Sequence, residues 1–173
     1  KIIDGSIKVG DHPIDISGTL AFDINSDVTA LPYNTFERVL DYLRVYCKMS
    51  CDTFHYKPTC ISTKKIQDLP NITIVYNGEN INIPPKIYAS VISDKEGGSS
   101  FYLNLKGTGI GMPYECYVTP SFKYAIIFDA NFMSYYYTVF DFSTGNNLVY
   151  LYTAKHPHPP GPNPDPNPDN TLL

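Results

Sequence analysis

The most informative pattern in the chain is "FDINSDVTALPYNTFERVLDYL", residues 22–43. An apolar strand pattern ends at Asp23, and a short polar run then leads to Leu31 and Pro32. Beyond this proline, apolar residues recur at the three- and four-residue spacing of an amphipathic helix. The stretch therefore predicts a strand, a polar turn that begins with a carboxylate, and a helix over 33–47.

The rest of the chain up to residue 154 is typical of a mostly β protein. Short alternating apolar runs are separated by turn residues, the clearest of which are Asn77 and Gly78. Aromatic residues make up 14% of the chain and charged residues 17%, the latter below the roughly 25% of an average domain. A length of 173 residues suits one domain, which we place at 1–154. Residues 155–173 hold seven prolines and predict an extended tail.

Charge and cysteine content limit the partners and the compartment. A net charge of −4 offers no basic surface for nucleic acid or anionic lipid, and no apolar run approaches the roughly 20 residues of a membrane span. Four cysteines are compatible with two disulfides in an oxidising compartment, in any of three connectivities. The close Cys-x-x-Cys pairs of a structural zinc site are absent from the sequence. We therefore expect no metal, no cofactor and a secreted, extracellular or secretory or vacuolar lumenal protein.

Three segments in this order carry a resemblance to a known family: residues 22–43, 69–88 and 125–154. They resemble the Asp-containing segment, the Leu-Pro-x-Ile strand with its Pro-x-x-Tyr continuation, and the closing Ile-Leu-Gly-Asp and Tyr-x-Val-Phe-Asp segment of pepsin-like aspartic proteases. The resemblance covers residues 1–154 and only the C-terminal lobe of that family. It implies a mostly β fold, a single pepsin-type lobe of stacked antiparallel sheets with one main α-helix.

The resemblance places Asp23 at one position of a catalytic pair. Such proteases hydrolyse peptides with two facing aspartates, one from each lobe, of which one keeps a proton while the other activates a water molecule. The glycine that follows the aspartate in the family permits a close backbone approach that a side chain forbids.

The sequence departs from the family pattern directly after Asp23. Ile24 replaces a hydroxyl residue, and Asn25 replaces the glycine. Ser26 keeps a hydroxyl, but Asp27 stands where the family has Ser or Thr and adds like charge. These changes indicate that Asp23 is the vestige of a catalytic residue.

Two further glycine positions of the family are also filled. Phe128 stands in the closing motif, where the family's glycine lies beside the active-site loop, and Tyr150 stands in the final strand. The apolar positions of the scaffold are kept by contrast. The resemblance therefore implies a degenerate active site on an intact β scaffold.

The function implied is that of a catalytically inactive, protease-like lobe that serves as a binding or structural subunit in a secreted or surface assembly. Its partner would be an N-terminal protease-like lobe on another chain, a second copy or a further subunit, with a peptide as a candidate ligand. The alternative is the C-terminal chain of an active two-chain aspartic endopeptidase that uses Asp23. An isolated inhibitor or lectin-like module is a third hypothesis.

The resemblance also implies covalent features. A disulfide between Cys60 and Cys116 fits the family's placement, with a local bridge between Cys47 and Cys51, unless Cys51 and Cys60 exchange roles. In addition, Asn71 begins an Asn-Ile-Thr sequon, which predicts N-glycosylation on a secretory route.

Three other patterns favour simpler interpretations. The run "DINSD" at 23–27 begins like a calcium loop but lacks the glycine and the closing glutamate. The run "GTGIGM" at 107–112 has neither the following helix nor the Lys-Ser/Thr ending of a phosphate-binding loop. His156 and His158 lie in the proline-rich tail, where solvated side chains are the ordinary expectation.

Overall fold

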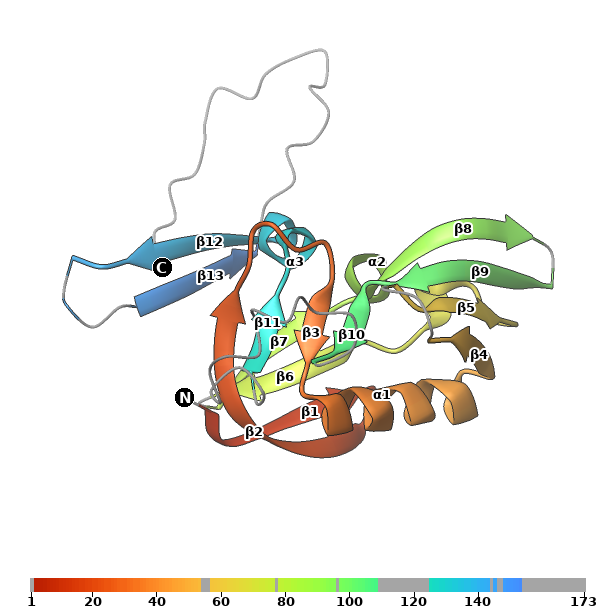
Figure 1. Ribbon diagram of the computed structural model, residues 1–173, viewed down its shortest axis with the longest axis horizontal. Coiled ribbons are helices and arrows are strands. Elements are labelled where there is room, and N and C mark those ends of the chain that lie inside the picture. Colours follow the sequence, from red (N-terminus) through yellow and green to blue (C-terminus); the bar gives the residue numbers. More distant parts are fainter. Residues whose placement is uncertain are drawn as a thin grey trace, which may run out of the picture. The chain divides into compact units, whose positions relative to one another are not determined.

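The computed structural model describes residues 2–53, 57–76, 78–95, 97–108, 125–143, 145 and 148–153 (Figure 1). The chain forms two compact units, Lys1–Tyr135 and Tyr136–Leu173. Strands dominate the described residues of both units, which confirms the predicted mostly β character. The predicted proline-rich tail lies outside the described residues.

The first unit is built on a seven-stranded sheet with the order β10-β3-β11-β2-β1-β6-β7. Its strands are β1 (Ile2–Val9), β2 (His12–Phe22), β3 (Thr29–Leu31), β6 (Ile72–Tyr76), β7 (Glu79–Ile83), β10 (Leu105–Gly107) and β11 (Ala125–Phe128). The hairpins β1–β2 and β6–β7 and the β1–β6 pair are antiparallel. The pairs β10–β3 and β11–β2 are parallel, however, so this sheet is mixed rather than purely antiparallel as expected.

A second, antiparallel sheet of the first unit has the order β4-β5-β9-β8. Its strands are β4 (Met49–Asp52), β5 (Thr59–Ser62), β8 (Ala89–Lys95) and β9 (Gly98–Leu103). A short 3-10 helix, η1 (Ile66–Asp68), comes after β5 in the chain. The sequence left 47–68 as irregular, whereas the structure places two strands of this sheet, β4 and β5, within that stretch.

The main helix is α1 (Tyr33–Tyr46), which confirms the helix predicted over 33–47. Its apolar face is buried and packs beside β10, β4 and β2 (Figure 1). The approach to β10 is close, because a Cβ added at Gly107 would lie 3.0 Å from Cδ2 of Tyr33 and 3.2 Å from Cδ1 of Phe36. The glycine therefore lets the strand and the helix pack at this distance.

Two short helices complete the first unit. They are α2 (Pro85–Tyr88), which follows β7, and α3 (Ala130–Tyr135), which follows β11. The sequence predicted a loop after β11, so α3 is a correction to that prediction. Among the described residues, no helix has the length and apolar character needed to cross a membrane.

The second unit is described as a single antiparallel ribbon of β12 (Tyr136–Asp141) and β13 (Leu148–Thr153). Gly145, in the connection between the two strands, has a φ of 71°, a backbone conformation that glycine adopts without steric cost. The strands and the turn agree with the pattern predicted from the sequence.

Candidate functional site

The turn that begins at Asp23 lies at one end of the seven-stranded sheet. Because β2 and β11 run parallel, their carboxyl ends lie side by side, with β3 on the other side of β11 (Figure 1). The backbone N–H of Asp23 donates a hydrogen bond to the carbonyl oxygen of Phe128 at 2.9 Å. The topology thus brings together two of the predicted site residues, Asp23 and Phe128, which come from segments far apart in the sequence.

Asp23 itself organises a local turn and is exposed to solvent. Its Oδ1 accepts a hydrogen bond from the N–H of Asn25 at 3.0 Å, and its carbonyl accepts one from the N–H of Ser26 at 3.2 Å. Among the described residues, Lys48 is the only non-glycine residue with a positive φ, so Asn25 needs no left-handed backbone. This side-chain-to-backbone pattern is an ordinary Asx turn.

The buried carboxylate at this end of the sheet belongs to Asp129, which is only 1% exposed. Its Oδ1 accepts hydrogen bonds from the Thr29 hydroxyl and the Phe132 N–H, both at 3.0 Å, and its Oδ2 accepts one from the Asn131 amide, also at 3.0 Å. The carboxylate therefore caps the first turn of α3 and fastens it to β3. Its acceptor positions serve the fold rather than a ligand.

Asp129 is the residue whose role sequence reasoning missed. It appeared there only as part of the closing motif, although an aspartate between an apolar strand and a short run of helix-compatible residues is a typical N-cap. The partner Thr29 lies 100 positions earlier in the chain, and no local pattern indicates that contact.

Asp27 is engaged in an ion pair with Lys57. The peptide groups of the turn are also used, since the Ser26 carbonyl accepts the Ala130 N–H at 2.9 Å and the Asp27 carbonyl accepts the Asn131 amide at 3.3 Å. Asp27 is exposed, and exposed pairs of this kind contribute about 0–1 kcal/mol. The turn is thus fastened to α3 mainly through its backbone.

The ring of Phe128 fills the interior instead of disturbing the turn. It is fully buried, stacks on Phe132 with ring centroids 3.8 Å apart, and lies 5.4 Å from the ring of Phe22. Ile24, at the position where the resemblance expects a hydroxyl, is 71% exposed. Because isoleucine has no polar side-chain atom, the residue next to the carboxylate offers it no hydrogen bond.

The remaining predicted residues are placed elsewhere. Tyr150 lies on β13 in the second unit, directly opposite Val139, and is exposed. Asn71 is exposed just before β6, and the hydroxyl of its sequon residue Thr73 donates to Oδ1 of Asn82 at 2.8 Å. His156 and His158 and most of the 107–112 run fall outside the described residues.

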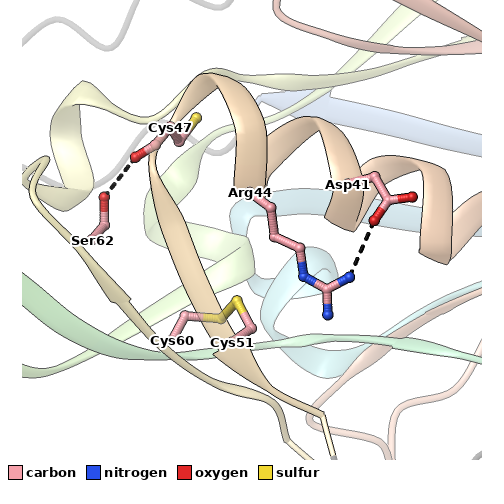
Figure 2. The surroundings of a disulfide bond; sticks show 6 residues. All are labelled: Asp41, Arg44, Cys47, Cys51, Cys60 and Ser62. Carbon is pink, nitrogen blue, oxygen red and sulfur yellow. Dashed lines mark hydrogen bonds and ion pairs between the residues drawn. A yellow bond between two sulfur atoms is a disulfide. The ribbon is translucent and has the colours of Figure 1, made fainter.

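The cysteines correct the expected disulfides. Cys51 and Cys60 are bonded across the β4–β5 pair, where the register sets them directly opposite with Cα atoms 4.1 Å apart (Figure 2). Cys47 is free and buried at the end of α1, its carbonyl accepts the Ser62 hydroxyl, and burial raises the pKa of its thiol. Cys116 lies outside the described residues.

Neither metal chemistry nor known relatives define the site. Within the described ranges, no group of three or more His, Cys, Asp or Glu side chains is arranged to hold a metal ion. A scan against models of protein families and a search of curated proteins both find no match. The pepsin-like assignment therefore stays a prediction from the three sequence segments.

Proposed function

We propose that the chain is a non-catalytic, aspartic-protease-like lobe that acts as a binding or structural subunit. The observation that carries this proposal is the state of the Asp23 turn. The carboxylate is exposed, one of its oxygens accepts the Asn25 N–H, and the neighbouring side chain is the exposed, apolar Ile24.

The site offers little that would support peptide hydrolysis. A general base of this kind needs a second carboxylate facing it, so that the two share one proton. The other acidic groups at this end of the sheet are committed to different partners, Asp27 to Lys57 and Asp129 to the α3 cap. A partner lobe would have to supply the second aspartate for the enzyme alternative to hold.

The binding role is supported by aromatic groups on the surface. Tyrosines are enriched in protein contact surfaces because they combine a large apolar ring with a hydroxyl. The second unit exposes three of them, Tyr137, Tyr150 and Tyr152. The Cys51–Cys60 disulfide is compatible with an extracellular or lumenal compartment, which is where we place this subunit.

The test is cleavage of peptide substrates between pH 2 and 7, with and without pepstatin, by the protein in its natural assembly. We expect no pepstatin-sensitive cleavage and no difference between the wild type and Asp23→Ala. Asp11→Ala is the matched control, because Asp11 is an exposed aspartate in the β1–β2 turn. Cleavage that pepstatin blocks, that Asp23→Ala abolishes and that Asp11→Ala retains would establish the two-chain endopeptidase instead.

A further inference from the structure

One face of the β12–β13 ribbon is lined by tyrosines. In the antiparallel register Tyr137 lies opposite Tyr152, and Val139 lies opposite Tyr150, so all four side chains share a face. We call this the tyrosine face. Tyr137, Tyr150 and Tyr152 are 65%, 40% and 48% exposed. A two-stranded ribbon is at best marginally stable in water by itself, so covering this face would stabilise it.

The rings stand in a row rather than in face-to-face contact. The centroids of Tyr150 and Tyr152 are 6.4 Å apart at an interplanar angle of 21°, and those of Tyr137 and Tyr152 are 6.3 Å apart at 44°. The buried stack of Phe128 on Phe132, by comparison, has a centroid distance of 3.8 Å. The tyrosines thus present ring surfaces to solvent and a hydroxyl donor at each tip.

This combination suits a polyproline-type ligand. Extended proline-rich peptides pack their pyrrolidine rings on aromatic side chains, and their carbonyl oxygens remain available to hydroxyl donors. Proline has no N–H, so such a segment cannot join the ribbon as a third strand and has to use a face. The tyrosine face offers the rings and the donors together.

The chain carries such a segment directly after the ribbon. Residues 157–168 contain seven prolines, and Pro-x-x-Pro spacing occurs at 157–160 and 159–162. At about 3.1 Å per residue in a polyproline helix, eight residues extend about 25 Å, more than the roughly 20 Å of a six-residue strand.

We propose that the proline-rich segment of this chain, residues 155–168, binds the tyrosine face of its own ribbon. Its prolines pack on Tyr137, Tyr150 and Tyr152, and the tyrosine hydroxyls donate to its carbonyl oxygens. The proposal deepens the proposed function, and rests on it only in treating the protein as a binding subunit. A free proline-rich peptide is then a competitor for the same face.

The test is the nitration rate of individual tyrosines by tetranitromethane, measured by peptide mass mapping on the full chain. The variant replaces the five prolines between 157 and 164 by alanine and keeps the length. A millimolar effective concentration and an intrinsic dissociation constant of about 0.5 mM predict nitration of Tyr150 and Tyr152 about threefold faster in the variant. The exposed Tyr33 and Tyr46 on α1 serve as internal references whose rates should not change.

A synthetic peptide of residues 155–168 separates the remaining outcomes. Added to the proline variant, it should restore protection of Tyr150 and Tyr152, and the double variant Tyr137→Ser/Tyr152→Ser should weaken that protection at Tyr150. Equal rates in wild type and variant, or no protection by the peptide, would overturn the proposal. Protection that grows with protein concentration would also overturn it, in favour of a second copy. Peptide cleavage at acid pH is measured in a separate experiment. A failure of the proposed function can therefore be distinguished from a failure of this docking proposal.

Discussion

The end of the seven-stranded sheet buries the side chains of its closing motif, whereas the β12–β13 ribbon exposes the side chains of its tyrosines. Phe128 is buried in a stack on Phe132, and Asp129 is buried with its acceptors filled. Tyr150, which also stands at a family glycine position under the pepsin-like resemblance, lies instead on an exposed ribbon face. The side chains of Phe128 and Asp129 are thus taken up by the interior, whereas that of Tyr150 adds to an exposed surface.

The two regions should therefore respond differently to substitution. A residue whose polar atoms are all paired in the interior cannot be removed without leaving donors unsatisfied, and each such donor costs free energy. A residue on an exposed strand face affects stability little and affects binding more. The comparison therefore separates a structural end of the molecule from a candidate contact surface.

A large effect is expected for Asp129→Ala. The substitution leaves the Thr29 hydroxyl and the Phe132 N–H without their buried acceptor, and we expect it to lower the free energy of unfolding by about 3 kcal/mol. Urea denaturation measures this. Asp23→Ala is the matched control, because loss of its exposed Asx turn should lower the free energy of unfolding by less than about 1 kcal/mol. Equal losses in the two variants would remove the distinction between the buried and the exposed aspartate.

Cys51→Ser should have a somewhat smaller effect than Asp129→Ala. Loss of the bridge to Cys60 opens a loop with a sequence separation of 9, for which chain entropy predicts a destabilisation of about 2.5 kcal/mol. Disulfide mapping by mass spectrometry with and without reduction is the accompanying measurement. If mapping joins Cys60 to Cys116 instead, the crosslink between β4 and β5 does not exist and the family-based pairing is restored.

The ribbon should tolerate a change that the sheet end does not. We expect Tyr150→Thr to change the unfolding free energy by less than about 0.5 kcal/mol, because threonine suits an exposed strand position. Differential scanning calorimetry provides the comparison with Phe128→Thr, which removes a buried ring and should cost about 3 kcal/mol or more. A large loss in Tyr150→Thr would show that this ring supports the fold.

Local signals in the sequence predicted much of the fold. Helix α1 followed from apolar spacing after Pro32, and the β6–β7 hairpin followed from Asn77 and Gly78, the latter with a φ of 83°. Strands β4 and β5 were missed because each has only four residues, of which one is buried in β4 and two are buried in β5. Too little apolar alternation is left in such strands to indicate them.

The candidate site was predicted less completely than the fold. The sequence indicated that Asp23 ends a strand, and the resemblance implied that Phe128 lies beside its turn. In the structure the N–H of Asp23 donates a hydrogen bond to the carbonyl of Phe128. It did not indicate that Asp129 is the buried carboxylate, since burial depends on Thr29, a residue 100 positions away. Helix α3, with six residues, is likewise too short for helical periodicity and depends on its cap.

The smallest expected effect tests the ribbon itself. The side-chain hydroxyl and the backbone N–H of Ser143 both donate to Oδ1 of Asp141, at 2.6 and 2.8 Å, and they lower the pKa of this carboxyl below its ordinary value of 3.8. A depressed pKa means that the carboxylate supports the end of β12 above its unfolded pKa, and that the support is lost as the pH falls through the folded pKa.

Ser143→Ala removes the hydroxyl but keeps the N–H, so the pKa of Asp141 should rise part of the way toward 3.8. Carboxyl-detected NMR titration between pH 2 and 6 follows this shift, with Asp11 as an exposed reference carboxyl that should not respond. A midpoint for Asp141 that Ser143→Ala leaves unchanged would mean that the turn of the ribbon is not held in this geometry. The tyrosine face would then lack the fixed register on which its row of rings depends, and the contrast with the sheet end would be one of order rather than of burial.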